Sequence, residues 1–161
     1  MKRLIFIPIV AVVAVAVIVI AGGGNDSGNA NAAPPGGQAP TASITTHKGK
    51  LGTYLVDGQG RTLYLFEADK PDVSNCSGGC LSVWPPMTAG SKPPVASGGV
   101  VASKLGMTTQ QSGKPVVTYG GHPLYYYTAD QKAGDATGQG LDQFGAEWYV
   151  VAPSGSKIDE G

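Results

Sequence analysis

Cys76 and Cys80 are the only cysteines of the chain and its most obvious candidates for chemistry. A C-x-x-x-C spacing on one helical turn would place the two Cα atoms about 6 Å apart, which a disulfide can span. Ser74 or Asn75 would cap such a turn, and Pro85 would end it. We therefore predict a structural disulfide, because the features described below place the domain in an oxidising compartment.

The same cysteines allow an alternative, a metal or thiol-redox site. Thiolate and imidazole ligands both suit Cu(I), and His122 is the candidate third ligand because His47 lies in or beside a spacer. The β-α-β pattern of a thioredoxin-like fold is not visible around the cysteines. The sequence therefore predicts no bound metal or cofactor, and an extracytoplasmic copper or redox role for Cys76, Cys80 and His122 stays open as the alternative.

Catalysis has little support in the sequence. The chain lacks G-x-S-x-G, H-E-x-x-H and phosphate-loop motifs, and its two histidines leave few ways to build a general base. The acidic stretch 130–142 lacks the spacing of a calcium loop. Eleven basic side chains balance eleven acidic ones, so no net charge attracts nucleic acid. We predict no catalytic residues and no nucleic-acid partner.

An internal repeat is the strongest clue to architecture. Residues 60–69 and 121–130 both fit the pattern G-x-x-L-Y-x-[FY]-x-A-D, and a tryptophan follows each copy. The two aspartates end equivalent segments, where a carboxylate would accept N–H bonds from a turn. The repeat-motif residues, which we predict to be mainly structural, are Tyr64, Phe66, Asp69, Trp84, Tyr125, Tyr127, Asp130 and Trp148.

Each copy is rich in β-forming residues, whose side chains would alternate between two faces. One face carries Tyr64, Phe66, Tyr125 and Tyr127, and the other carries Leu63, Leu65, Leu124 and Tyr126. Large side chains on both faces favour strands that are covered on two sides. The alternative is that some of the tyrosines and tryptophans form an open surface that binds a sugar or a partner.

Turn signals precede both copies. Asp57-Gly58 separates residues 53–56 from the first copy, and Gly120-Gly121 separates residues 115–119 from the second. Residues 100–108 and 148–152 are further candidate strands. We predict a small all-β domain, sandwich or barrel-like, of six to eight strands over residues 47–153. Its repeats lie near 51–86 and 115–152, and residues 154–161 form a tail.

The N-terminus has the features of an export signal. Lys2-Arg3 precedes an apolar run from residue 4 to 21, which is also long enough to cross a bilayer. We predict a signal peptide or membrane anchor at 1–21 and a flexible Gly/Asn/Ala/Pro linker at 22–46. The protein would be secreted or anchored to the outer face of the cytoplasmic membrane, touching the membrane only through residues 4–21 if these are uncleaved.

Residues 64–69 and 125–130 also fit the shorter motif Y-x-[FWY]-x-x-D. They occur together with the two cysteines, with Trp84-Pro85-Pro86 and with a Gly-Asp-x-Thr-Gly segment at 134–138. In this combination, over about residues 50–153, the chain resembles the bacterial secreted-repeat family of predicted lipoproteins. Gly23 stands where a lipoprotein would carry its lipid-bearing cysteine. The resemblance implies an envelope repeat without an assigned activity.

These features predict an exported cell-envelope module with a binding or structural role and no catalysis. Its partner would be an envelope protein or a wall glycan. The alternative is the copper or thiol-redox protein described above.

Overall fold

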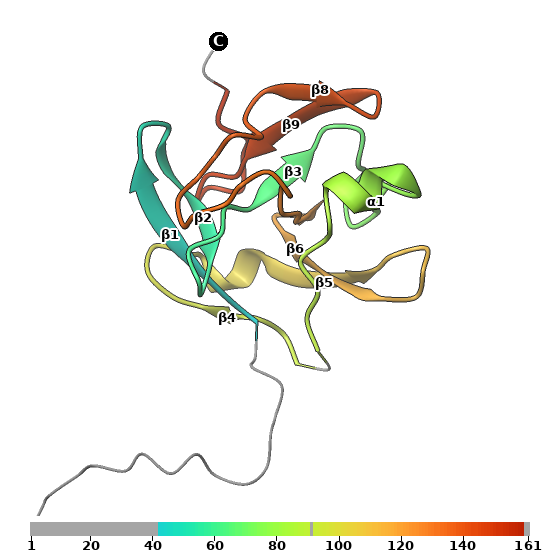
Figure 1. Ribbon diagram of the computed structural model, residues 1–161. Coiled ribbons are helices and arrows are strands. Elements are labelled where there is room, and N and C mark those ends of the chain that lie inside the picture. Colours follow the sequence, from blue (N-terminus) through green and yellow to red (C-terminus); the bar gives the residue numbers. More distant parts are fainter. Residues whose placement is uncertain (1–41, 91, 160–161) are drawn as a thin grey trace, which may run out of the picture. The chain divides into compact units, whose positions relative to one another are not determined.

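The computed structural model describes residues 42–90 and 92–159. Within these ranges the regular elements are almost all strands, which confirms the all-β prediction (Figure 1). The elements are β1 (Ser43–Gly49), β2 (Gly52–Asp57), β3 (Tyr64–Phe66), α1 (Gly79–Val83), β4 (Val95–Ala96), η1 (Ala102–Lys104), β5 (Leu105–Thr109), β6 (Pro115–Tyr119), β7 (His122–Pro123), β8 (Leu141–Gln143) and β9 (Ala146–Val150).

The N-terminal segment predicted as signal or anchor lies outside the described residues, as does most of the linker. In the described part of the chain, no helix is both long and apolar enough to cross a membrane.

The strands form three small sheets, with the orders β2-β1-β4, β3-β9-β8 and β5-β6-β7. All neighbours are antiparallel except β1 and β4. Backbone hydrogen bonds also join one sheet to another, for example from the N–H of Leu55 in β2 to the carbonyl of Val151, which follows β9 (2.8 Å). The β3-β9-β8 sheet and α1 adjoin in Figure 1, and this region holds the repeated aromatic residues.

Both predicted hairpins are present. In the first, Val56 pairs with Thr62 across a turn closed by the N–H of Gly60 and the carbonyl of Asp57 (2.9 Å). Gly60 has φ +83°, and a Cβ at this position would lie 2.8 Å from Cβ of Ala133, so the turn requires glycine. In the second, two consecutive glycines with positive φ join β6 to β7.

The predicted alternation of side chains is confirmed, because the two faces of each copy pack into different clusters of the core. One cluster contains Leu63, Leu65 and Leu124 together with the half-buried Tyr126. The other contains Tyr64, Phe66, Tyr125, both tryptophans and both cysteines, with Tyr127 packed against it. The regular strands are nevertheless shorter than the copies, since β3 and β7 cover only three and two residues.

The ordered domain extends beyond the predicted limits at both ends. β1 begins at Ser43, so His47 lies inside a strand and not in a spacer, and Ile44 is fully buried. At the other end, residues 156–158 turn back onto β9, where the N–H of Ile158 donates to the carbonyl of Val150 (3.0 Å). Backbone pairing fixes both segments. Their mostly polar composition lacks the apolar alternation by which a strand is predicted from sequence.

The disulfide between Cys76 and Cys80 is present, with a Cα–Cα distance of 5.4 Å. The capping expected from Ser74 or Asn75 is wrong. The helix begins at Gly79 after Gly78, without a side-chain cap, because Ser74 and Asn75 make contacts with Tyr125 and Asp69 instead. The helix ends at Val83, so its end lies just before the proline pair, as predicted.

Candidate functional site

The two motif tyrosines meet at the centre of the domain. The N–H of Tyr64 donates to the carbonyl of Tyr125 (2.9 Å), and the N–H of Tyr125 donates to the carbonyl of Tyr64 (3.0 Å). Residues that exchange both bonds form the hydrogen-bonded type of antiparallel pair. The two copies of the motif therefore run antiparallel to each other at this pair. Both tyrosine side chains are fully buried.

Each tyrosine hydroxyl reaches the aspartate of the other copy. Tyr64 donates to Oδ2 of Asp130 (2.7 Å), and Tyr125 donates to Oδ2 of Asp69 (2.7 Å). Burial raises the pKa of both tyrosines far above the usual value, so the phenols stay neutral and can donate. The two copies are thus interlocked by a reciprocal pair of hydrogen bonds.

The second oxygen of each aspartate holds the loop that follows its own copy. Oδ1 of Asp69 accepts the N–H of Asn75 (2.6 Å), and Oδ1 of Asp130 accepts the N–H of Thr137 (2.9 Å) and its hydroxyl (2.6 Å). Each aspartate therefore fixes the loop that follows its own copy and also the tyrosine of the other copy.

Burial raises the pKa of Asp69 to about 6, although its bonds from Asn75 and Tyr125 favour the charged form. The native state therefore holds the Asp69 proton more tightly than the unfolded chain does. Between about pH 4 and 6 the free energy of unfolding should fall as pH rises. Asp69→Asn should remove this fall, whereas Asp142→Asn, at an exposed position, should retain it. Urea unfolding at several pH values measures both, and a flat difference between wild type and Asp69→Asn contradicts the prediction.

Four aromatic rings form one continuous stack. Tyr127 lies on Trp84 (4.3 Å between centroids), Trp84 lies on Trp148 (3.9 Å), and Trp148 lies on Phe66 (4.2 Å). Each copy contributes one end of the stack and the tryptophan that follows the copy in the sequence. The first copy gives Phe66 and Trp84, and the second gives Tyr127 and Trp148. All three pairs are stacked, with interplanar angles of 26°, 4° and 11°, and aromatic pairs contribute beyond the area that they bury.

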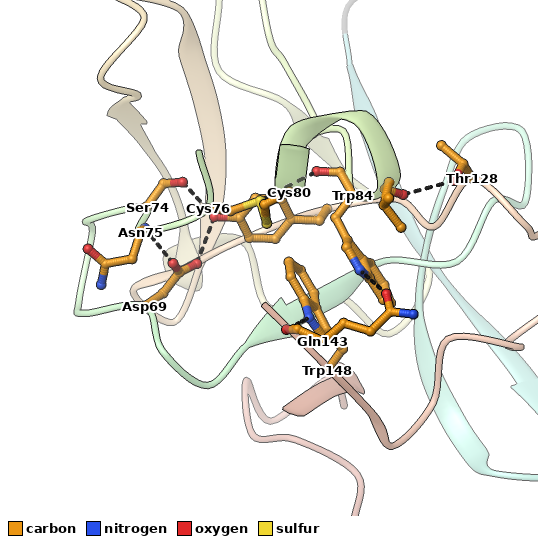
Figure 2. The surroundings of a disulfide bond; sticks show 11 residues. Asp69, Ser74, Asn75, Cys76, Cys80, Trp84, Thr128, Gln143 and Trp148 are labelled. Carbon is orange, nitrogen blue, oxygen red and sulfur yellow. Dashed lines mark hydrogen bonds between the residues drawn. A yellow bond between two sulfur atoms is a disulfide. The ribbon is translucent and has the colours of Figure 1, made fainter. Parts of the chain in front are cut away.

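Gln143 connects the two tryptophans. The indole N–H of Trp84 donates to its side-chain oxygen (2.9 Å), and that of Trp148 donates to its backbone carbonyl (3.0 Å). Figure 2 shows both indoles beside the disulfide and α1, with Gln143 between their nitrogen atoms. Both buried indole donors are thus satisfied, as buried polar groups in folded proteins usually are.

The disulfide belongs to the same cluster, and both cysteines are almost fully buried. His122 lies on β7 in another sheet. Within residues 42–90 and 92–159, no group of three or more His, Cys, Asp or Glu side chains could hold a metal ion. The structure thus does not bring Cys76, Cys80 and His122 together as a ligand set, and both sulfurs are bonded to each other.

We expect the disulfide to act as a brace. Cys76→Ala/Cys80→Ala should lower the free energy of unfolding by about 2 kcal/mol, because the bond closes a short loop in the unfolded chain. Chemical denaturation of the variant and of the wild type, with and without dithiothreitol, measures this. The reductant should destabilise the wild type and leave the variant unchanged. A variant as stable as the oxidised wild type would contradict the role.

The two ends of the aromatic stack differ. Phe66 of the first copy is buried, at 2% exposure. Tyr127 stands at the equivalent position of the second copy, is half-buried, and lines a groove of about 540 Å³. Its hydroxyl takes part in none of the side-chain hydrogen bonds found in the described part of the chain. The same scaffold is therefore closed in one copy and open in the other.

Polar and charged groups surround the open end. Besides Tyr126 and Tyr127, the groove is lined by three threonines (Thr62, Thr88 and Thr128), by Pro85 and Pro86, and by residues 130–133 and Arg61. A smaller depression of about 300 Å³ shares Arg61, Thr88 and Tyr126 with it. Cavities of this size are typical of sites for small molecules or for one segment of a polymer.

A bonded network holds the floor where the two depressions meet. The guanidinium of Arg61 lies 3.9 Å from the ring centroid of Tyr126 and makes a 2.7 Å ion pair with the buried carboxylate of Asp57. Tyr126 donates to the same carboxylate (3.1 Å). Burial, followed by the charge of Asp57, raises the pKa of Tyr126. Its phenol therefore stays neutral, and the floor is pre-organised.

The structure separates the aromatic residues that the sequence grouped together. Tyr64, Tyr125, Trp84 and Trp148 are fully buried, whereas Tyr126 and Tyr127 reach the groove. The sequence did not single out Arg61, Lys132 or Gln131. A signal was available, because the second copy has Tyr-Tyr-Thr at 126–128 where the first has Leu-Phe-Glu.

Comparison with protein families matches residues 45–88 and 106–152, more than half of the chain, to a family described as a secreted repeat of unknown function. Each match covers one copy of the motif, in agreement with the two predicted repeats. No curated protein and no solved structure matches the chain. With both copies matched, the chain belongs to this family of secreted repeats.

Proposed function

We propose that this secreted repeat is a non-catalytic binding module of the cell envelope, and that its ligand lies in the groove beside Tyr127. The difference between the two ends of the aromatic stack carries the proposal. The first copy closes its end with a buried Phe66, while the second copy keeps a half-buried ring with a free hydroxyl at a groove. Pre-organised polar groups around a half-buried ring are typical of binding sites.

The chemistry of the groove favours binding over catalysis. Asp130 is the carboxylate in the larger depression, and it accepts three hydrogen bonds from Tyr64 and Thr137. These bonds engage three of the roughly four lone-pair positions of the carboxylate, which leaves it little capacity to act as a general base. Asp57 in the smaller depression is likewise held by Arg61 and Tyr126. Both carboxylates thus support the walls of the groove.

Co-sedimentation with the isolated envelope of the producing cells tests the proposal. Thr88 is exposed and lines both depressions, so Thr88→Trp should fill the groove and weaken binding at least tenfold. Thr53 is an exposed strand threonine outside the groove, so Thr53→Trp is the matched control and should bind like the wild type. Equal binding by both variants would refute the groove as the site.

A further inference from the structure

We infer that the ligand of the groove is an anionic saccharide whose charge is recognised by Lys132 and Arg61. This inference rests on the proposed function and adds the chemical class of the ligand.

The charged groups of the groove differ in whether a ligand can contact them. Internal donors bind the carboxylates of both depressions: Arg61 and Tyr126 bind Asp57 in the smaller one, and Tyr64 and Thr137 bind Asp130 in the groove. Lys132 is exposed, and its ammonium group makes no ion pair in the described part of the chain. Asp130 keeps its negative charge, because its donors are neutral, so the two cations and two carboxylates of the depressions balance. A charged ligand would therefore gain its attraction from direct contact with the ammonium group of Lys132 and not from a net positive field.

Arg61 adds a second, fixed cation. Its Nε and Nη2 atoms contact Asp57 at 2.8 and 2.7 Å, and its Cζ atom lies over the ring of Tyr126, 3.9 Å from the centroid. The side chain is still 55% exposed. The Nη1 group is the part of the guanidinium that these contacts leave available, and a planar guanidinium held in place suits an oxyanion.

The uncharged groups of the groove favour a saccharide over a peptide. Thr88, Gln131 and the hydroxyl of Tyr127 offer donors and acceptors to a ligand rich in hydroxyl groups. Two common modes of peptide binding use a free sheet edge or an apolar pocket that is open to the peptide's side chains. Here the guanidinium of Arg61 lies over the ring of Tyr126, and Tyr127 is already stacked on Trp84.

The test compares four probes by titration calorimetry at low and physiological salt: tetragalacturonate, neutral chitotetraose, phosphorylated maltotetraose and oligoglutamate. We expect tetragalacturonate or phosphorylated maltotetraose to bind, and the one that binds identifies the anion as carboxylate or phosphate. Affinity should fall about three- to tenfold in Lys132→Gln and fall further with added salt. Lys114→Gln, at an exposed site outside the groove, should leave affinity unchanged.

The other outcomes overturn the inference in distinguishable ways. One such outcome is that chitotetraose binds, and that Thr88→Trp abolishes this binding while Lys132→Gln does not change it. This result would reject an anionic ligand and keep the groove as a binding site. Preferential binding of oligoglutamate would reject the saccharide. If none of the probes binds while Thr88→Trp still releases the protein from the envelope, the ligand class is wrong and the proposed function stands. If Thr88→Trp does not affect envelope binding, both the proposed function and the inferred ligand class are rejected.

Discussion

Trp84→Ala is expected to lower the free energy of unfolding by about 3–5 kcal/mol, the usual cost of truncating a large buried aromatic side chain. Trp84 is fully buried and lies between Tyr127 and Trp148 in the stack. Its removal leaves a cavity at the junction of the two copies and frees the side-chain oxygen of Gln143. Such a loss is a large fraction of the 5–15 kcal/mol typical of a domain.

The surroundings of Trp84 cannot easily collapse into that cavity. Gly138 lies so close that a Cβ there would be 2.6 Å from Cη2 of the indole, and its N–H is fixed to the hydroxyl of Tyr64 (3.2 Å). Urea unfolding followed by far-UV circular dichroism measures the loss. Tyr127→Phe is the control, because it keeps the ring of the stack, and it should stay within about 0.5 kcal/mol of the wild type. A loss below about 1 kcal/mol for Trp84→Ala would show that the stack is not a major source of stability.

The local structure of the repeat could be predicted because it depends on neighbouring residues. The Asp57-Gly58 and Gly120-Gly121 pairs determine the hairpins through turn geometry. Alternation along each copy assigns Tyr64 and Leu63 to opposite faces, and the structure places them in different core clusters. The disulfide also followed from spacing and compartment, although the expected cap did not, since nothing in the sequence shows that Asn75 contacts Asp69.

The candidate site could not be predicted, because it depends on contacts between residues far apart in the chain. Tyr64 and Asp130 are 66 residues apart, and Tyr125 and Asp69 are 56 apart. The repeat shows that two equivalent tyrosines and aspartates exist, but not that they pair across the copies. The groove likewise joins Arg61 to residues 126–133, and only the paired copies bring these together.

Divergence between equivalent positions is the sequence feature that comes nearest to marking the site. Identical residues, such as Tyr64 and Tyr125, form the buried centre that both copies need. The positions that differ, Phe66 against Tyr127, separate a closed end from an open one. In a duplicated domain the shared residues therefore explain the fold, and the unshared ones are the better guide to a ligand.

Asp130→Ala is expected to cost about 2–3 kcal/mol of unfolding free energy, more than most surface substitutions. The change leaves the hydroxyl of Tyr64 buried without its acceptor, at a penalty of about 1–3 kcal/mol, and releases the N–H of Thr137. Asp142→Asn, at an exposed position, is the control and should cost less than about 0.5 kcal/mol.

A double-mutant cycle separates the cross-copy bond from the loop contact. Tyr64→Phe removes the stranded hydroxyl, so Asp130→Ala should cost about 1–2 kcal/mol less in that background than in the wild type. Urea unfolding of the four proteins gives the coupling energy. Additive losses would mean that Asp130 acts through its own loop alone. Because Tyr64 belongs to one copy and Asp130 to the other, a positive coupling measures how strongly each copy depends on its partner to fold.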